Sequence, residues 1–562
     1  YVERYGRGSE DAGLDECAKV CHNLTQHAPT TFREAMQLIL FIYNVYLIYA
    51  GKYIACLTVG RLDHILLPLY QNDIKKGILT EDDAGAFIDD FSAKMSMHLG
   101  RGEHQMAHLN ADYEQTGWLR NHVYDSPGYI VIGGYGEHIE HTRNPLTILF
   151  AQHIHPELKN PIYVFRYTSD CGDDLLRILS KKIQENASIL LYNDETVIPA
   201  YLHVGVEKKD ALNYGIYPCN WASLSGCSTY VRWPRGKSLP EILNDALISG
   251  KDFKTIDEIY EEVVERYSKQ IRPDIEYCRN ELQNKKVPTG GCLSINDCFM
   301  QGAIESAKGI AFGGVKYPAG YMLLRSIGTA ADMLSAIDKL VFRDKVCTLT
   351  ELVEATKNDF EGDEKLLQHC KLAPKYGTDD DFADGHATRL MTELLDCIDR
   401  EATNETGTRD VYTFNVTIND QNHIGAGAKL SATVDGRRKG EPLSENLSPA
   451  GGYSKGVKAL LNSVSKLPFE RIHSGALNVR LRRNMVKGED GNNCLMALIR
   501  TYFEQGGMQL QFSIADTEEL KNAQKNPDEY RDLMVRITGY SAIFVDMSKG
   551  AQDEFIRREE LE

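Results

Sequence analysis

The first third of the chain repeats apolar residues at the spacing of amphipathic helices. One helix is predicted to begin after Thr31, which is a good N-cap residue and is followed three positions later by Glu34, the pattern of a capping box. The most apolar stretch of the chain, Leu38–Ala50, contains Asn44 and three tyrosines. It is too short and too polar to span a membrane, so it predicts a buried core helix.

Short apolar runs interrupt these helical segments. Residues 129–134, 162–166 and 189–192 are rich in β-branched and aromatic side chains, which is typical of buried strands. Strands separated by long helical segments favour an α/β architecture, with a barrel as one form of it. A loop-rich stretch is expected from about 403 to 455, followed by a compact C-terminal region.

Composition narrows the class of protein. The chain has 562 residues, of which 42% are hydrophobic and 25% charged, as in ordinary globular proteins with room for two or more lobes. The net charge of −17 argues against nucleic acid or an anionic membrane as partner. Thirteen dispersed cysteines without a CxxC pair, and no signal peptide, indicate a reducing cytoplasm and no metal site.

Common catalytic motifs are missing from the sequence. The glycine-rich segment 425–427 lacks the Lys-Ser/Thr pair of a phosphate-binding loop, and there is no HExxH or GxSxG motif. The acidic run 379–381 lacks the alternating ligands of a calcium loop. These patterns therefore indicate no hydrolase, kinase or dehydrogenase.

The C-terminal region contains a distinctive segment around Gly539. It reads Val-Arg-Ile-Thr-Gly-Tyr-Ser-Ala-Ile-Phe over 535–544, and Gln-Asp-Glu at 552–554 and Arg558 follow. Alone, a glycine between β-branched and aromatic residues predicts a bulge or tight turn. Further segments accompany it: Phe-Arg-Glu-Ala at 32–35, Asn-Asp-Glu at 193–195, Ala-Asp-Met-Leu-Ser-Ala-Ile at 331–337, Ala-Pro-Lys-Tyr-Gly at 373–377, Asp-Gly-Arg-Arg-Lys-Gly-Glu-Pro-Leu at 435–443 and Asp516 to Pro527.

Together these segments resemble the glycyl radical enzymes over nearly the whole chain. The resemblance implies an α/β fold in which a ten-stranded barrel of two half-barrels surrounds a finger loop and is itself surrounded by helices. It also implies two domains, a pyruvate formate-lyase-like barrel over 1–430 and a glycine radical domain over 431–562. The family's usual chain is longer at the N-terminus, and this chain begins at Tyr1 without a methionine, so we expect a truncated N-terminal part.

The resemblance also implies the chemistry. Gly539 stores a radical at its α-carbon, where a side chain would prevent the planarity that spreads the radical into both flanking amides. A cysteine thiol then relays the hydrogen atom between Gly539 and the substrate. No cofactor or metal is bound; a separate activating enzyme with an iron–sulfur cluster and S-adenosylmethionine installs the radical, and the enzyme is expected to be a homodimer.

Two cysteines compete for the role of relay, Cys219 and Cys227. The family places this cysteine five residues after a tyrosine that follows an acidic segment, and Tyr214 stands five residues before Cys219. A Leu-Pro helix normally starts about twenty residues later, and Leu239 is twenty residues after Cys219 but twelve after Cys227. Both flanks favour Cys219, with Cys227 as the alternative; either thiol could also be a small buried apolar group.

The relay segment departs from the family pattern Gly-Cys-Val-Glu. Here it reads Pro-Cys-Asn-Trp over 218–221, so Trp221 occupies the place of the glutamate that acts as general base in the dehydratases. Trp233 occupies the expected place of a second carboxylate. The adjacent cysteine pair of pyruvate formate-lyase is also missing, so cleavage of a keto acid is not expected.

The same region predicts how a substrate is held. Trp221 and Trp233 favour an apolar or aromatic substrate, and Arg232 and Arg235 are suited to a carboxylate. The alternative is that the tryptophans pack in the core and the arginines lie on a solvated turn. The leading hypothesis is a lyase that cleaves a C–C or C–heteroatom bond in a small organic molecule. A synthase that adds a hydrocarbon to fumarate, and a non-catalytic binding relative, remain alternatives.

Overall fold

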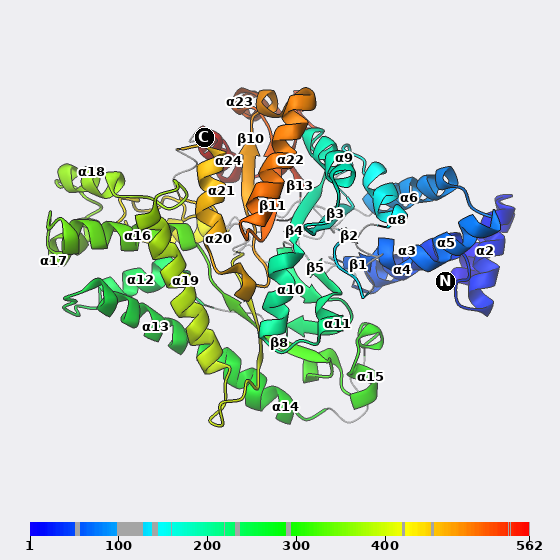
Figure 1. Ribbon diagram of the computed structural model, residues 1–562, viewed down its shortest axis with the longest axis horizontal. Helices are drawn as coiled ribbons and strands as arrows, with labels where there is room; N and C mark the ends of the chain where they lie inside the picture. Colours follow the sequence, from blue (N-terminus) through cyan, green and yellow to red (C-terminus); the bar gives the residue numbers. More distant parts are fainter. Residues whose placement is uncertain are drawn as a thin grey trace.

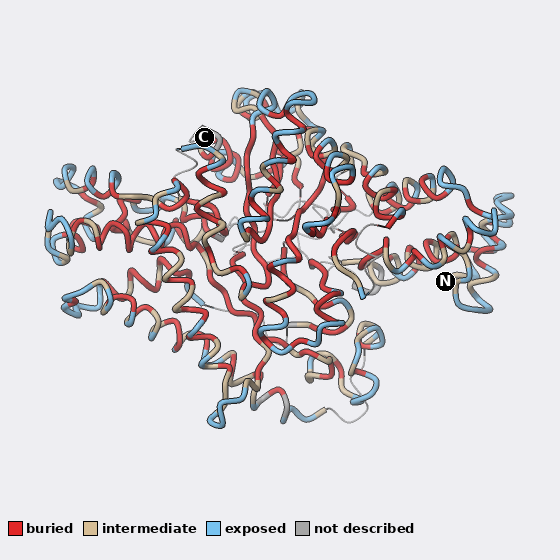
Figure 2. The backbone as a smooth tube through the Cα atoms, in the orientation of Figure 1, coloured by how far each residue is buried: buried red, intermediate tan, exposed pale blue. Residues whose placement is uncertain are grey.

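Sheets occupy the centre of the molecule and helices surround them, as Figure 1 shows for the computed structural model. The structure describes residues 1–50, 57–97, 128–137, 144–158, 160–217, 220–230, 236–287, 294–418, 422–450, 455–537, 539 and 541–560. Figure 2 shows that the central strands are buried and that exposed residues gather on the outer helices. The core is therefore the space around the sheets.

Four parallel strands form the first half of the central β-structure, in the order β1-β2-β3-β4. They are β1 (Leu57–Arg61), β2 (Gly128–Gly133), β3 (Ile162–Tyr167) and β4 (Ile189–Asn193). Every residue of β2, β3 and β4 is buried, as expected of parallel strands covered on both faces. The predicted strands at 129–134, 162–166 and 189–192 match these three within two residues.

The second half runs in the opposite direction. Strand β11 (Gln509–Ile514) pairs antiparallel with β4, and β10 (Asn478–Leu481) pairs parallel with β11. A parallel bridge between Val416 and Ser474 continues to a parallel sheet of β9 (Tyr412–Val416), β8 (Tyr317–Leu323) and β7 (Ser228–Tyr230). Two parallel groups meet along one antiparallel seam, in agreement with two half-barrels.

This architecture confirms the predicted α/β class. Among the described residues the two larger sheets have six and three strands, so the total of ten stays a prediction. Strands β10 and β11 come from the C-terminal part of the chain and share a sheet with β1–β4. The central sheet therefore draws on both sides of the domain boundary expected near residue 430.

The N-terminal helices form one group at the end of the molecule that carries the N-terminus (Figure 1). They are α1 (Val2–Asp11), α2 (Asp15–Gln26), α3 (Phe32–Ala50), α4 (Leu62–Ile65), α5 (Leu67–Lys76) and α6 (Glu81–Ser96). Helix α3 begins as predicted, with the Thr31 hydroxyl accepting the Glu34 N–H at 3.2 Å, but the Glu34 carboxylate reaches Thr30 instead of Thr31. One face of α3 lies in the core, with Leu40, Phe41 and Tyr43 buried, and much of the rest is half-buried, so the prediction of a buried core helix holds for one face.

The middle of the chain contributes a further set of helices, some of which lie against the strands and some of which form a group at the end opposite the N-terminus (Figure 1). They are α8 (Pro145–Gln152), α9 (Asp173–Gln184), α10 (Asp194–His203), α11 (Lys208–Ala211), α12 (Leu239–Leu247), α13 (Ile256–Glu276), α14 (Leu282–Asn284), α15 (Ala303–Ser306), α16 (Ile327–Ile337), α17 (Leu349–Lys357), α18 (Glu364–Leu372) and α19 (Asp381–Glu401). None of the helices in the described ranges is both long and apolar enough to cross a membrane.

The last part of the chain contains α20 (Asn422–Lys429), α21 (Val457–Ser465), α22 (Gly488–Glu504), α23 (Thr517–Lys525) and α24 (Lys549–Glu560). The stretch 403–455 is less irregular than predicted, because it holds β9 and α20. Its glycine-rich segment 425–427 lies inside α20, where a Cβ on Gly427 would come within 2.3 Å of the Glu441 carbonyl oxygen. Close packing against the following turn explains that glycine.

Two short hairpins complete the fold. In the first, β5 (Tyr214–Tyr217) pairs antiparallel with β6 (Trp221–Leu224), and Asn220 lies in the tip between them. In the second, β12 (Met534–Arg536) pairs antiparallel with β13 (Ser541–Ile543), and Gly539 lies in the connecting turn. These two tips carry the two segments that the resemblance makes chemically important.

Candidate active site

Gly539 lies buried in the turn of the C-terminal hairpin. Its φ angle is +75°, in the left-handed region that is easily reached only without a Cβ. The predicted tight turn is thus present, and backbone geometry alone already favours glycine here. In this fold, the glycine that the resemblance assigns to the radical is also the glycine that the turn favours.

Both peptide groups that flank the Gly539 α-carbon are hydrogen-bonded. The N–H of Gly539 donates to Oε1 of Gln511 at 3.2 Å, and its carbonyl oxygen accepts from the Tyr129 hydroxyl at 2.8 Å. Tyr129 belongs to β2 and Gln511 to β11, so the two half-barrels hold the turn from opposite groups of strands. The two amides into which an α-carbon radical would spread are therefore fixed in place.

The tip of the β5–β6 hairpin lies against the same glutamine. Nδ2 of Asn220 donates to Oε1 of Gln511 at 3.4 Å, and the Asn220 carbonyl oxygen lies 3.3 Å from the Tyr192 hydroxyl. Asn220, directly before β6, has a φ of +66°, which asparagine tolerates better than most residues. Gln511 therefore contacts both the radical loop and the hairpin tip.

The two candidate relay cysteines differ in what surrounds them. Cys219 lies outside the described residues, immediately before Asn220 in the sequence. Cys227 is buried in the turn between β6 and β7, beyond the end of β6 that lies away from Asn220. Its thiol lies 3.8 Å from Oδ1 of Asp210, and burial together with this carboxylate raises the pKa of Cys227 to about 11. Among described residues, it is Asn220 that meets the Gly539 network.

The predicted substrate-binding residues are only partly described. Trp221 is buried, and its ring centroid lies 5.4 Å from that of Tyr321 on β8. Trp233, Arg232 and Arg235 lie outside the described residues. Trp221 thus joins an aromatic pair in the interior, and the other three remain predictions.

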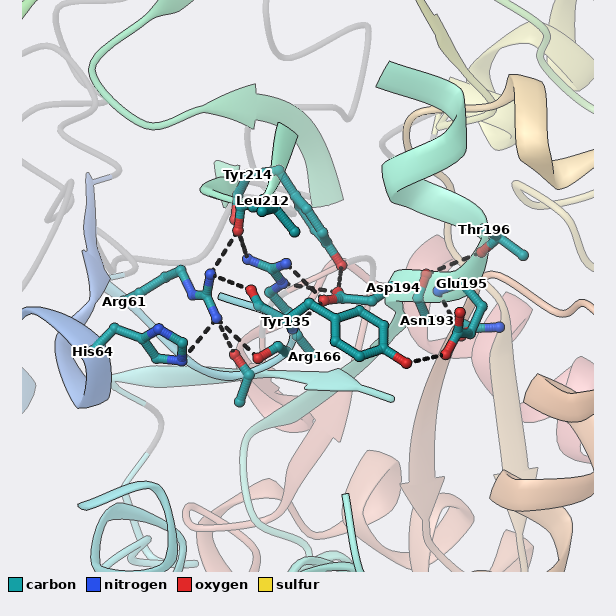
Figure 3. Close-up of polar contacts among 12 residues, drawn as sticks. Arg61, His64, Tyr135, Arg166, Asn193, Asp194, Glu195, Thr196, Leu212 and Tyr214 are labelled. Carbon is teal, nitrogen blue, oxygen red and sulfur yellow. Dashed lines mark hydrogen bonds and ion pairs between the residues drawn. The ribbon is translucent and has the colours of Figure 1, made fainter. Parts of the chain in front are cut away.

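The base of the β5–β6 hairpin is held by buried arginines, shown in Figure 3. Arg166 of β3 forms a two-pronged ion pair with Asp194, at 2.8 and 2.7 Å, and donates to the Leu212 and Tyr214 carbonyl oxygens. Arg61 of β1 donates to the same Leu212 oxygen at 2.6 Å. Arginines from two strands of the first half-barrel therefore hydrogen-bond to the backbone where the hairpin begins.

Further contacts complete this arginine network. The Tyr214 hydroxyl donates to Oδ1 of Asp194 at 2.7 Å, and the Arg166 guanidinium lies 3.9 Å from the Tyr214 ring centroid. Burial, and then the neighbouring charge of Arg166, lower the pKa of Arg61 to about 9. Although burial opposes it, the Asp194 carboxylate raises the pKa of Arg166 above its usual value. Arg166 therefore stays positively charged and remains an ion-pair partner for the Asp194 carboxylate.

A cavity of about 600 Å³ opens beside the hairpin. Ser223 of β6 and Tyr321, the ring partner of Trp221, both line it, together with residues of β1, β7 and α3. Its described lining consists of apolar and hydroxyl-bearing side chains and Asn296, without a charged group: Ile39, Ile42, Tyr43, Tyr46, Leu57, Thr58, Val59, Ser223, Gly226, Ser228, Thr229, Asn296, Phe299, Met300, Ile310 and Tyr321. The volume suits a small ligand.

The segment 435–443, which carries much of the sequence resemblance, has a structural part in this fold. The buried Arg437 guanidinium donates to backbone carbonyls around it, among them those of Arg438 at 3.0 Å and Glu441 at 2.5 Å. It folds the turn that leads into Glu445, whose buried carboxylate lies 3.3 Å from Nη1 of Arg558 on α24. The segment therefore helps to seat the C-terminal helix.

Gln511, Tyr129, Asn220 and Arg166 do not stand out as site residues in the sequence. A usable signal existed for two of them: Arg166 is a lone charge in an apolar strand, and Gln511 follows Gln509 on the same face of another. Buried polar groups need partners, so such residues in a strand indicate a polar network. No cluster of three His, Cys, Asp or Glu suited to a metal occurs in the described ranges.

Comparison with known proteins identifies the family. Residues 7–421 match the family model of pyruvate formate lyase-like proteins, and residues 443–545 match that of the glycine radical. The chain is 29% identical to isethionate sulfite-lyase of Nitratidesulfovibrio vulgaris, over 97% of this chain and 67% of that protein. It is 26% identical to (2S)-3-sulfopropanediol dehydratase of Klebsiella oxytoca, over 100% of this chain and 70% of that protein.

Solved structures agree. A glycyl radical enzyme from Archaeoglobus fulgidus superposes with a TM-score of 0.86 at 25% identity, covering 99% of this chain and 73% of that one. The glycerol-bound B12-independent glycerol dehydratase from Clostridium butyricum superposes with a TM-score of 0.83 at 26% identity, covering 99% and 72%. The predicted class of enzyme, a glycyl radical lyase that depends on an activating enzyme, is confirmed. The chain belongs to the pyruvate formate lyase-like family of glycyl radical enzymes.

Proposed function

We propose that this enzyme uses a radical on Gly539 and a thiyl on Cys219 to cleave a C–C or C–heteroatom bond in a small organic substrate. The observation that supports these roles best is the shared contact of Gln511, whose side-chain oxygen accepts from Gly539 and from Asn220. Asn220 directly follows Cys219 in the sequence. The segment that carries the relay thiol and the loop that stores the radical thus meet at one side chain.

The proposed cycle conserves hydrogen atoms and electrons. The Gly539 radical takes the hydrogen of the Cys219 thiol, which restores the Gly539 C–H bond and leaves a thiyl. The thiyl takes a hydrogen atom from a substrate C–H bond, and the substrate radical then breaks its neighbouring bond and expels the leaving group. The product radical regains hydrogen from the thiol, and the new thiyl regenerates the Gly539 radical.

The cavity beside the hairpin is the substrate site in this proposal. Its described lining supplies apolar surface and hydroxyl groups but no carboxylate. Those residues therefore offer no Asp or Glu side chain as a general base. Ser228 and Thr229 of β7 line it, and Arg232 and Arg235 follow them in the sequence. A substrate with a short apolar body and a terminal anion, such as a carboxylate or a sulfonate, fits these side chains. The sulfonates in the names of two relatives are consistent with this class.

Activation requires a second protein in this proposal. Gly539 is buried, so its hydrogen atom is removed by an enzyme that reaches the loop when the C-terminal region opens. We infer that this partner carries an iron–sulfur cluster and uses S-adenosylmethionine, and that the radical enzyme is a homodimer. We also retain the division into a barrel domain over 1–430 and a glycine radical domain over 431–562.

Electron paramagnetic resonance after anaerobic activation tests the proposal. The enzyme should show a doublet, because the single hydrogen left on the Gly539 α-carbon splits the radical signal. Cys219→Ala should keep the doublet and lose turnover by at least a thousandfold. Cys227→Ala is the matched control, since that thiol bonds Asp210 instead, and it should retain both. Full turnover in Cys219→Ala, with loss in Cys227→Ala, would refute the relay assignment.

Product analysis separates the remaining alternatives. Incubation of the activated enzyme with short hydroxy-sulfonates, hydroxy-carboxylates and diols should release sulfite, water or carbon dioxide from one class. A product that forms only when fumarate is added would indicate the radical-addition synthase. Absence of any doublet with a competent activating enzyme would favour the non-catalytic relative.

A further inference from the structure

We propose that Gln511 is the positioning residue that holds the radical loop and the hairpin tip together for hydrogen-atom transfer. Gln511 is fully buried on β11, and its side-chain oxygen faces Gly539 N–H and Asn220 Nδ2 at 3.2 and 3.4 Å. The inference rests on the proposed roles of Gly539 and Cys219. It adds a residue outside both hairpins that sets the distance between them.

The amide of Gln511 can adopt only one orientation. Its Nε2 donates to the Ile537 carbonyl oxygen at 2.5 Å and to Oδ1 of Asn478, while its Oε1 accepts from the Gly539 N–H. A backbone carbonyl only accepts and a backbone N–H only donates, so a flipped amide would face two repulsive contacts. With two donors and two acceptor positions used, the side chain is saturated and rigid.

This arrangement ties the radical loop to the barrel at two points. Gln511 bonds backbone groups on both sides of residue 538, at Ile537 and at Gly539. Its side-chain amide thereby pairs with the loop backbone as the backbone of a neighbouring strand would. The same oxygen then reaches Asn220, whose backbone carbonyl is also in contact with Tyr192 of β4. The radical loop is thus hydrogen-bonded to a side chain of β11, and the hairpin tip to side chains of β11 and β4. These two adjacent antiparallel strands form the seam between the half-barrels.

Distance matters because hydrogen-atom transfer requires close approach of the reacting atoms. A displacement of 1 Å can slow an enzymatic step by about a hundredfold. Removal of the Gln511 amide leaves Gly539 N–H and Ile537 C=O without these partners, and a buried loop compensates by moving. The radical should still form, since the activating enzyme acts on an exposed loop, but its exchange with the relay thiol should slow.

Deuterium exchange measures that step directly. Thiol hydrogens exchange with water and Gly539 C–H hydrogens do not, so in D2O a working relay replaces the α-hydrogen by deuterium and collapses the doublet. Gln511→Met keeps the side-chain length and removes the amide. It should form the radical within about twofold of the wild-type yield, collapse ten- to a hundredfold more slowly, and lose kcat by a similar factor.

Two further variants make the test specific. Asn220→Gly keeps the left-handed backbone and removes the hydrogen bond to Gln511, and it should slow the collapse up to about tenfold. Gln509→Met is the matched control: Gln509 is equally buried on the same strand but bonds the Leu477 N–H, so collapse should proceed at the wild-type rate.

The outcomes separate this inference from the function it rests on. Wild-type collapse rates in Gln511→Met, or equal slowing in Gln509→Met, would overturn the positioning role. If Gln511→Met forms no radical, Asn220→Gly decides, and an unslowed collapse in that variant also overturns it. A wild-type enzyme without a doublet, or with one that never collapses, would instead refute the proposed function.

Discussion

At the scale of single residues, the surroundings of Gly539 favour a delocalised radical. The hydrogen bonds from Tyr129 and to Gln511 keep its two flanking amides oriented, and burial excludes solvent. Tyr129 is itself buried, and a buried hydroxyl is normally hydrogen-bonded. The environment of the radical is therefore set by side chains from strands far away in sequence.

Tyr129→Phe should change the radical without abolishing it. Loss of the 2.8 Å hydrogen bond leaves the Gly539 carbonyl oxygen buried and unpaired, at a cost of about 1–3 kcal/mol in stability. Spin distribution over that amide should shift, and the α-hydrogen splitting of the doublet with it. Tyr163→Phe is the control, because its buried hydroxyl bonds Ser92 and not Gly539. An unchanged splitting in Tyr129→Phe would contradict the prediction.

At the scale of elements, the β5–β6 hairpin is held at both ends. The Arg61 and Arg166 guanidiniums bond the backbone carbonyls where it begins, and Asn220 meets Gln511 where it turns (Figure 3 shows the base). A two-stranded hairpin is marginally stable alone, so these external bonds are what make it rigid. The arginine network thus helps to fix the hairpin that carries the proposed relay.

Arg166→Lys should uncouple turnover from radical formation. Lysine keeps the charge but cannot form the two-pronged pair with Asp194 and also reach the hairpin carbonyls. We expect an unfolding free energy lower by about 1–3 kcal/mol, a normal doublet, and a kcat reduced at least tenfold. Thermal unfolding, paramagnetic resonance and activity measure these three. The exposed Arg177→Lys should change none of them, and wild-type kcat in Arg166→Lys would contradict the role of the network.

At the scale of the whole molecule, the two half-barrels enclose the site and the C-terminal region closes it. Helix α24 is anchored by Arg558, which is buried and bonds Glu554 at 2.8 Å and Glu445 at 3.3 Å. In spite of burial, Arg558 and Arg480 hold the pKa of Glu445 below its usual value, so the pair stays ionised. These buried charges therefore hold α24 in place, and its residues Glu554, Phe555 and Arg558 line a small pocket together with Arg536 and Ile537, which lead to Gly539.

Arg558→Met should make the Gly539 loop easier to reach. Removal of one partner from a buried ion pair costs about 3–5 kcal/mol, so α24 should detach more often. We expect faster activation, and faster oxygen-dependent cleavage of the chain at Gly539, followed by mass spectrometry of the released C-terminal piece. Arg557→Met alters a half-exposed pair on the same helix and should have little effect. Equal rates in the two variants would count against this anchoring role.

Much of the fold was accessible from local patterns. Apolar runs at 129–134, 162–166 and 189–192 predict β2, β3 and β4 because buried parallel strands need apolar side chains on both faces. The region 403–455 was harder, since β9 and α20 are short and are stabilised by packing against distant strands and turns. The half-burial of α3 could not be predicted from the sequence either, because the burial of a helix depends on which elements pack against it.

The candidate site divides in the same way. The segment around Gly539 and the flanks of Cys219 were recognisable because each function requires particular residue types at fixed local spacing. Only the tertiary structure brought Tyr129 to Gly539 across 410 positions and Gln511 to Asn220 across 291. The sequence by itself singled out the residues proposed to store and relay a radical. The packing of two half-barrels decided which distant polar groups hold them, because those contacts exist only when the chain is folded.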